Sequence, residues 1–173
     1  VFEENFATTG GVIWAENATL NLLDCALTKN TPMQTEIETP NGGALALLNC
    51  NAELNGCLIS ENSSLGKGAG IYTEIYPFKS VIAENCTFCG NSSSDDENIS
   101  VSVMDTNYDT VPKIRLYFSS VFGKVGFLKE NAETFGCLFV ADTAVEENKQ
   151  DSTCTATGSY DEVVYCSVCH GEL

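Results

Sequence analysis

Short runs of apolar residues, or of alternating apolar and polar residues, recur along residues 1–126 and are separated by glycine and asparagine. None continues with the 3.6-residue spacing of an amphipathic helix, and each is only four or five residues long. Runs of this length, bounded by Gly and Asn, are typical of β-strands that end at tight bends. We therefore expect strands at residues 20–23, 44–48, 79–83, 99–103 and 114–118.

The strands belong to a repeat of about 30 residues. The phrase Cys-x-apolar-x-x-Asn occurs three times, and a glycine-rich phrase followed by apolar residues precedes each copy. The repeated glycines are Gly11, Gly43 and Gly70. The three copies of the first phrase contribute Cys25, Leu27 and Asn30, then Cys57, Ile59 and Asn62, then Cys86, Phe88 and Asn91.

Stacking explains why these residue types repeat. The Cys and the apolar residue are two positions apart, so both project from one face of an extended segment. Asparagine and glycine tolerate the backbone angles of a sharp bend. Coils stacked about 4.8 Å apart would place each Cys, each apolar residue and each Asn in a column of its own. The Asn amides could then bond up and down the stack. The repeat predicts an all-β parallel β-helix, or solenoid, of about five coils.

The glycine-rich phrase followed by apolar-x-x-Asn resembles the repeats of polymorphic outer-membrane proteins and their protist β-helix relatives. The members here are Phe2 to Asn5, Leu27 to Asn30, Ile59 to Asn62 and Phe88 to Asn91. The resemblance covers roughly residues 1–91. It departs from the family pattern at residues 68–70, where Ala separates the two glycines, and it has no clear copy after Asn91. It implies a right-handed helix, displayed on a cell surface and associated with adhesion, and supplies no catalytic residue.

The pattern also predicts the organisation of the chain. We expect residues 1–145 to form the coils and residues 146–173 to form a Cys-rich C-terminal cap or the start of a further module. The acidic stretch 92–97 should be an exposed loop. Because the first copy of the phrase lacks its Cys, we expect either further coils before Val1 or another subunit stacked there. The expected partners are therefore copies of the protein or neighbouring β-helix segments.

Composition narrows the function classes. The chain has 24 acidic and eight basic residues, a net charge of -16. Such a surface disfavours nucleic acid and anionic lipid. No apolar run is long enough for membrane insertion. We expect an extracellular or cell-surface filament, coat or adhesive module without catalytic residues. The alternatives are a carbohydrate-active β-helix enzyme using Asp105 or Asp109, and a carbohydrate-binding module. The second alternative requires exposed rings at Trp14, Tyr72, Tyr76 and Tyr117.

Nine cysteines and five N-x-Ser/Thr sequons favour an oxidising, extracellular compartment and N-linked glycans. The sequons are at Asn17, Asn62, Asn85, Asn91 and Asn98. Asn62 and Asn91 also belong to the predicted Asn column, so Asn17, Asn85 and Asn98 are the better glycan sites. Cys50 with Cys57, and pairs among Cys137, Cys154, Cys166 and Cys169, are candidate disulfides. The alternative for the column Cys25, Cys57 and Cys86 is packing as small buried apolar residues.

Two further motifs suggest cofactors. The acidic residues Asp95, Asp96 and Glu97 are a candidate calcium site, because Ca²⁺ prefers several oxygen ligands; a solvated loop is the simpler explanation. Cys166, Cys169 and His170 match the C-x-x-C-H pattern of haem attachment, although a disulfide pattern explains the two cysteines as well. We expect no cofactor other than glycans and, as an open alternative, calcium.

Overall fold

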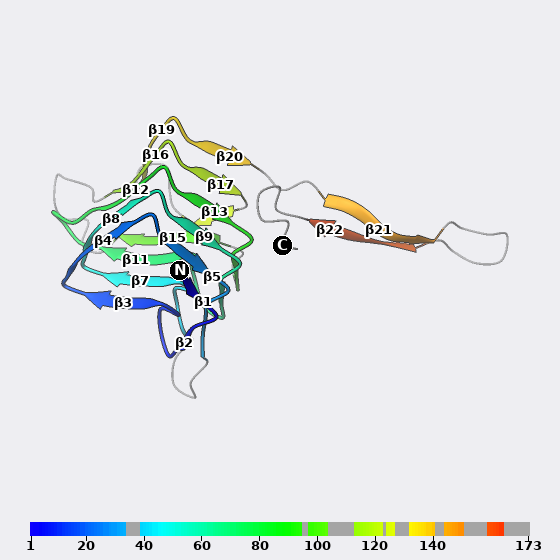
Figure 1. The fold of residues 1–173 in the computed structure, drawn as a ribbon, viewed down its shortest axis with the longest axis horizontal. Coiled ribbons are helices and arrows are strands. Elements are labelled where there is room, and N and C mark those ends of the chain that lie inside the picture. Colours follow the sequence, from blue (N-terminus) through cyan, green and yellow to red (C-terminus); the bar gives the residue numbers. More distant parts are fainter. Residues whose placement is uncertain are drawn as a thin grey trace.

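The computed structural model describes residues 1–33, 39–94, 97–103, 113–122, 124–126, 132–140, 144–150 and 159–164. These residues form an all-β solenoid of about four turns, built from parallel strands and containing no helix in the described part of the chain (Figure 1). The predicted fold class is confirmed. Strands β3 to β17 make four coils with one strand in each of three sheets, and β18, β19 and β20 extend each sheet by one strand.

Strands that are adjacent in a sheet come from successive coils and pair in parallel. The first sheet contains β3 (Ile13–Glu16), β7 (Leu45–Leu48), β11 (Ile71–Ile75), β15 (Glu97–Val103) and β18 (Lys124–Gly126). The second contains β4 (Thr19–Leu23), β8 (Asn51–Asn55), β12 (Val81–Glu84), β16 (Ile114–Tyr117) and β19 (Ala132–Phe135). The third contains β1 (Phe2–Glu3), β5 (Ala26–Thr28), β9 (Leu58–Ser60), β13 (Thr87–Cys89), β17 (Ser120–Phe122) and β20 (Leu138–Val140).

Three further pairs complete the described strands. Two of them are parallel: β2 (Phe6–Ala7) pairs with β6 (Thr31–Pro32), and β10 (Ser63–Ser64) pairs with β14 (Ser92–Ser93). The third pair, β21 (Ala144–Gln150) with β22 (Ser159–Val164), is antiparallel and forms a sheet of its own. Strand β21 spans the boundary expected between residues 145 and 146, and the cysteines of the expected cap lie outside the described residues.

Each coil turns at corners where one residue adopts the left-handed backbone conformation. At the corner before the third sheet these residues are Asp24, Gly56, Asn85, Phe118 and Gly136, with φ between +48° and +64°. Asn and Asp tolerate this region better than other residues with a side chain, and glycine is unrestricted there.

A different corner explains the glycine-rich phrase. Gly10, Gly42 and Gly68 all have positive φ, and a Cβ added to Gly42 would lie 2.3 Å from the Leu45 carbonyl oxygen. Gly43 donates its N–H to the Gly68 carbonyl, as Ala44 does to that of Ala69. Ala69 therefore stacks on Gly43, so of the repeated glycines Gly11, Gly43 and Gly70 the third lies one position out of register. The glycine required in every copy is the first of the phrase.

The interior is a stack of apolar columns. Phe2 pairs with Leu27, Leu27 with Ile59, Ile59 with Phe88 and Phe88 with Val121. The last four are buried, and Phe2, at the end of the stack, is 41% exposed. Inward residues of the other two sheets fill the remaining space, which buries the apolar side chains of every coil against the coils above and below.

The predicted Cys column is present and continues beyond its three expected members. Ser119 and Cys137 occupy the position in the next two coils, immediately before β17 and β20. Each side chain of this column, whether a Cys thiol or the Ser119 hydroxyl, donates to the backbone carbonyl oxygen two residues earlier in the chain. From Cys57 onward each also donates to a carbonyl of the preceding coil: for Cys86 these oxygens belong to Glu84 and Leu54, at 3.3 and 3.6 Å. The column therefore satisfies carbonyl groups at the corner without forming disulfides.

The Asn column is a continuous ladder of amide hydrogen bonds. Asn62 Oδ1 accepts from the backbone N and from Nδ2 of Asn30, at 2.9 and 2.8 Å. Asn62 Nδ2 donates to Asn91 Oδ1 and to the Leu27 carbonyl, both at 2.9 Å. Asn5 bonds Asn30 in the same way. Asn62 is 0% exposed, so its amide replaces water for backbone groups that the bend leaves unpaired.

The ladder predicts that Asn62→Ala destabilises the solenoid by about 4 kcal/mol, because two donors of Asn30 and two buried acceptors lose a partner. Urea unfolding followed by circular dichroism measures the loss. Asn21→Ala is the matched control, since Asn21 is exposed on β4, and it should change stability by no more than about 0.5 kcal/mol. Equal losses in the two variants would contradict the structural role of the ladder.

The buried thiols predict a weaker structure at alkaline pH. Burial raises the pKa of Cys86 from 9.0 to about 12, so between these values the unfolded thiol ionises while the folded thiol keeps its proton. The free energy of unfolding therefore falls as pH rises above 9. Cys86→Ser removes this titration and keeps a donor like Ser119 in the column. Between pH 8 and pH 10.5 the unmodified chain should lose about 1–2 kcal/mol more than the variant; superimposable pH profiles would contradict this.

Candidate functional site on the solenoid surface

The structure divides the five predicted glycan sites into two groups. Asn62, Asn91 and Asn98 are buried in the ladder, so the preference for Asn98 as a glycan site is wrong. Asn98 Oδ1 accepts from Asn91 Nδ2, and its own Nδ2 donates to the Phe122 carbonyl at 2.6 Å. A side-chain amide buried and held in this way has no space for a glycan. Asn17 and Asn85 are exposed at corners with positive φ.

The predicted disulfide between Cys50 and Cys57 is not formed. Both thiols are buried and free, and Cys50 Sγ donates to the Leu48 and Ala15 carbonyls. Cys25, Cys86 and Cys137 are also free thiols. The other candidates, Cys154, Cys166 and Cys169, lie outside the described residues, as does His170 of the haem pattern.

The predicted acidic sites are only partly described. Asp95, Asp96, Asp105 and Asp109 lie outside the described residues, and Glu97 begins strand β15. Among the residues that the structure describes, no group of three or more His, Cys, Asp or Glu side chains could hold a metal ion. The calcium and enzyme hypotheses remain predictions from the sequence.

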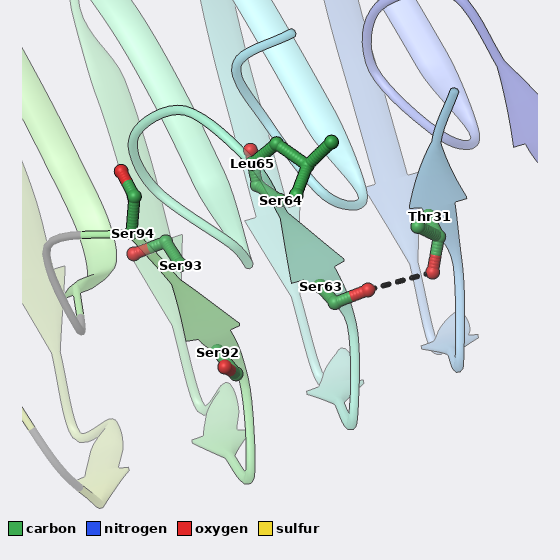
Figure 2. Close-up of a pocket in the computed structure, with 7 residues that line it drawn as sticks. All are labelled: Thr31, Ser63, Ser64, Leu65, Ser92, Ser93 and Ser94. Atoms are coloured by element: carbon green, nitrogen blue, oxygen red, sulfur yellow. Dashed lines mark hydrogen bonds between the residues drawn. The ribbon is translucent and has the colours of Figure 1, made fainter. Parts of the chain in front are cut away.

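Two grooves lie on the outer surface. The first, which we call the hydroxyl groove, has a volume of about 310 Å³ and follows the short strands β6, β10 and β14 (Figure 2). Thr31 and Ser63 share a hydrogen bond of 2.7 Å between their hydroxyls, and Ser92 occupies the same position one coil further. The whole lining is Thr31, Ser63, Ser64, Leu65, Ser92, Ser93 and Ser94.

The hydroxyl groove is a by-product of the ladder. Asn30, Asn62 and Asn91 of the ladder are each followed by Thr or Ser, which begins a short strand at the same rung. Much of its hydrogen-bonding capacity is already used: Ser64 Oγ donates to the Pro40 carbonyl at 2.8 Å, and Ser94 Oγ donates to the Gly66 carbonyl at 2.9 Å. The groove carries no charged or aromatic side chain, so it offers little to hold a ligand.

The second groove, which we call the aromatic groove, has a volume of about 270 Å³ and lies on the outer face of the first sheet. Trp14, Ala46 and Tyr72 form one outward column, because Trp14 pairs with Ala46 and Ala46 with Tyr72. Leu48 and Glu74 form the neighbouring outward column. The remaining lining residues are Thr9, Thr39 and Asn41.

The chemistry of the aromatic groove combines one open ring with fixed polar groups. Trp14 is 53% exposed, whereas Tyr72 is 8% exposed and donates its hydroxyl to Glu74 Oε1 at 2.8 Å. Burial and, secondly, this bond to Glu74 raise the pKa of Tyr72, which keeps the hydroxyl a donor. Asn41 Oδ1 accepts from the Lys67 backbone N at 2.8 Å, which fixes the orientation of the Asn41 amide.

The structure brings together only two of the four aromatic residues singled out in the sequence. Trp14 and Tyr72 share the groove, but Tyr72 is only 8% exposed, so the expectation of exposed rings at all four positions is wrong. Tyr76 is exposed and lies outside the groove lining. Tyr117 is half-buried on the second sheet, and its hydroxyl donates to Glu133 Oε1 at 3.1 Å. The groove itself had a signal in the sequence, because Trp14, Ala46 and Tyr72 each occupy the fifth position of the glycine-rich phrase.

Comparison with known proteins finds one match. Residues 56–74 match the Chlamydia polymorphic membrane protein repeat. The matched segment runs from the corner at Gly56 through β9, Asn62 and Gly68 into β11, so it contains one rung of the ladder and one glycine corner. The repeat and the solenoid together fit a surface or adhesin-like protein. No curated protein and no solved structure matches the chain. Within the described residues, no helix is long and apolar enough to span a membrane.

The burial of the sequons makes a direct prediction. When the chain passes through a eukaryotic secretory pathway, glycans should be attached at Asn17 and Asn85 and be absent from Asn62, Asn91 and Asn98. Enzymatic deglycosylation in ¹⁸O-water followed by peptide mass spectrometry marks each occupied site. Asn17→Gln and Asn85→Gln should each remove one glycan and leave the fold unchanged. An occupied Asn62 in folded protein would contradict the ladder.

Proposed function

We propose that the chain is a structural or adhesive segment of an extracellular or cell-surface protein, in which β-solenoid coils stack end to end into an extended object. The observation that carries the proposal is the asparagine ladder, which joins successive coils by the same contacts. The Oδ1 atoms of Asn30, Asn62 and Asn91 each accept two hydrogen bonds from the coil before.

The backbone and the core repeat in the same way as the ladder. Successive coils pair in parallel in all three sheets, and Leu27, Ile59 and Phe88 are buried one above another in a single apolar column. A coil that carries an Asn at the ladder position can therefore stack on another by strand pairing, amide hydrogen bonds and apolar contact, whether the two belong to one protein or to neighbouring copies.

Charge and location agree with this role. The net charge of -16 keeps solenoids apart laterally, so that association is favoured at the ends, where the contacts are apolar and hydrogen-bonded. The repeat match supports a surface location, and the resemblance implies display and adhesion. The interior of the described coils is filled with apolar columns and satisfied amides, which makes the solenoid a rigid support for outward-facing side chains.

Electron microscopy of the native, unreduced protein tests the proposal. Elongated particles should appear, with an axial repeat that is a multiple of about 4.8 Å. Phe2→Lys places a charge in the apolar column beside Leu27 and should shorten them. Leu65→Lys adds the same charge beside the hydroxyl groove and should leave particle length unchanged. Discrete globular particles for the unmodified protein would overturn end-to-end stacking and favour the alternative of a carbohydrate-active enzyme. Turnover assays on a panel of glycans would then test that alternative.

A further inference from the structure

We propose that the aromatic groove binds an uncharged saccharide, with a sugar ring lying on the indole of Trp14. The inference deepens the adhesive function proposed above and rests on it, since it names the class of ligand that an outward face of the solenoid would hold. The groove is small and elongated across three rungs, from Trp14 through Ala46 to Tyr72, and its volume of about 270 Å³ lies at the lower limit of ligand sites.

The apolar side of the site is formed by the register of the first sheet. Trp14 and Tyr72 are two rungs apart, about 9.6 Å along the stack, and the methyl group of Ala46 lies between them. A small residue between two aromatic ones leaves a hollow on this face of the sheet. The exposed indole offers a large rigid face at little cost in conformational entropy. Such a face complements the C–H groups of a pyranose ring.

The polar side of the site is already oriented. Glu74 is half-buried, and the Tyr72 hydroxyl holds its Oε1, which leaves Oε2 as an acceptor with no hydrogen-bond partner among the described residues. Asn41 uses Oδ1 on the Lys67 backbone, which leaves its Nδ2 to donate. The hydroxyl of Thr39, exposed at the rim, can do either. Neighbouring hydroxyl groups of a sugar need this mixture of donors and acceptors beside an apolar face.

Charge restricts the class of sugar. Glu74 and the net charge of -16 disfavour uronic acids, sulfated sugars and phosphate. A cation would be attracted to the ring of Trp14 by the cation–π interaction and to the carboxylate of Glu74 by its charge. However, an ammonium or guanidinium group has no acceptor for the Asn41 amide, whereas every sugar hydroxyl can accept from it. The Nδ2 donor of Asn41 therefore favours an uncharged saccharide over a basic side chain as the ligand of the groove.

The test uses the single tryptophan of the chain. Its fluorescence should change saturably on titration of the full chain with at least one of cellohexaose, mannohexaose and N-acetylchitohexaose. Oligogalacturonate and hexalysine are the anionic and cationic probes, and neither should cause a saturable change. Isothermal titration calorimetry then measures affinity for the variants, whose folding is checked by circular dichroism.

The variants separate the sources of affinity. Trp14→Ala should weaken binding of the saccharide at least about tenfold, and Trp14→Phe less, because part of the stacking surface remains. Tyr76→Ala removes an exposed ring outside the groove and should leave affinity unchanged. Glu74→Gln replaces one of the two acceptor oxygens by a donor and removes the charge, so it should weaken saccharide binding severalfold without abolishing it, whereas binding of a cation would be lost.

Two outcomes overturn the inference. One is the absence of binding by all three neutral oligosaccharides. The other is binding of hexalysine that Glu74→Gln abolishes, which would assign the groove to a basic partner. Neither outcome alters the particles seen by electron microscopy, because Trp14 and Glu74 face outward from the first sheet and take no part in the asparagine ladder or the apolar core. Failure of the saccharide site is therefore distinguishable from failure of the proposed stacking.

Discussion

The hydrogen bonds between buried asparagine side chains determine which coil stacks on which, and the remaining structure depends on that register. Each amide of the ladder bonds the backbone and the amide of its neighbours, so a slip of one position would leave several buried polar groups without partners. Apolar columns alone tolerate exchange between Leu, Ile, Phe and Val, as residues 27, 59, 88 and 121 show. The amide ladder supplies the specificity that these columns lack.

Once the register is set, the outer surface follows from it. A strand in every coil places side chains outward at intervals of about 4.8 Å, so residues some 30 positions apart in the sequence become neighbours. The aromatic groove arises in this way from Trp14, Ala46 and Tyr72, and the hydroxyl groove arises from the residues that follow the ladder. Two sequons, at Asn62 and Asn91, have the same origin: Asn serves the ladder and the following Ser residues serve the short strands, so these motifs are buried structural elements.

The sequence was sufficient for the fold class and for the columns, because Cys, apolar and Asn positions repeat together. It failed where a different residue fills the same position. Ser119 replaces Cys and donates to the same kind of carbonyl oxygens, so the fourth coil showed no copy of the phrase. Asn98 reaches the ladder from β15 instead of from the expected bend. Because no local spacing in the sequence reveals this contact, Asn98 was wrongly preferred as a glycan site. Gly70 was misaligned because only the first glycine of the phrase needs positive φ.

The central claim is that the asparagine amides form a continuous buried ladder, and side-chain amide hydrogen exchange measured by NMR tests it most directly. The account predicts that the Nδ2 protons of Asn30, Asn62 and Asn91 exchange orders of magnitude more slowly than those of the exposed Asn17 and Asn85, because ladder exchange requires local unfolding of the stack. Fast and equal exchange at all five asparagines would contradict the ladder, and with it the register on which both grooves and the proposed stacking depend.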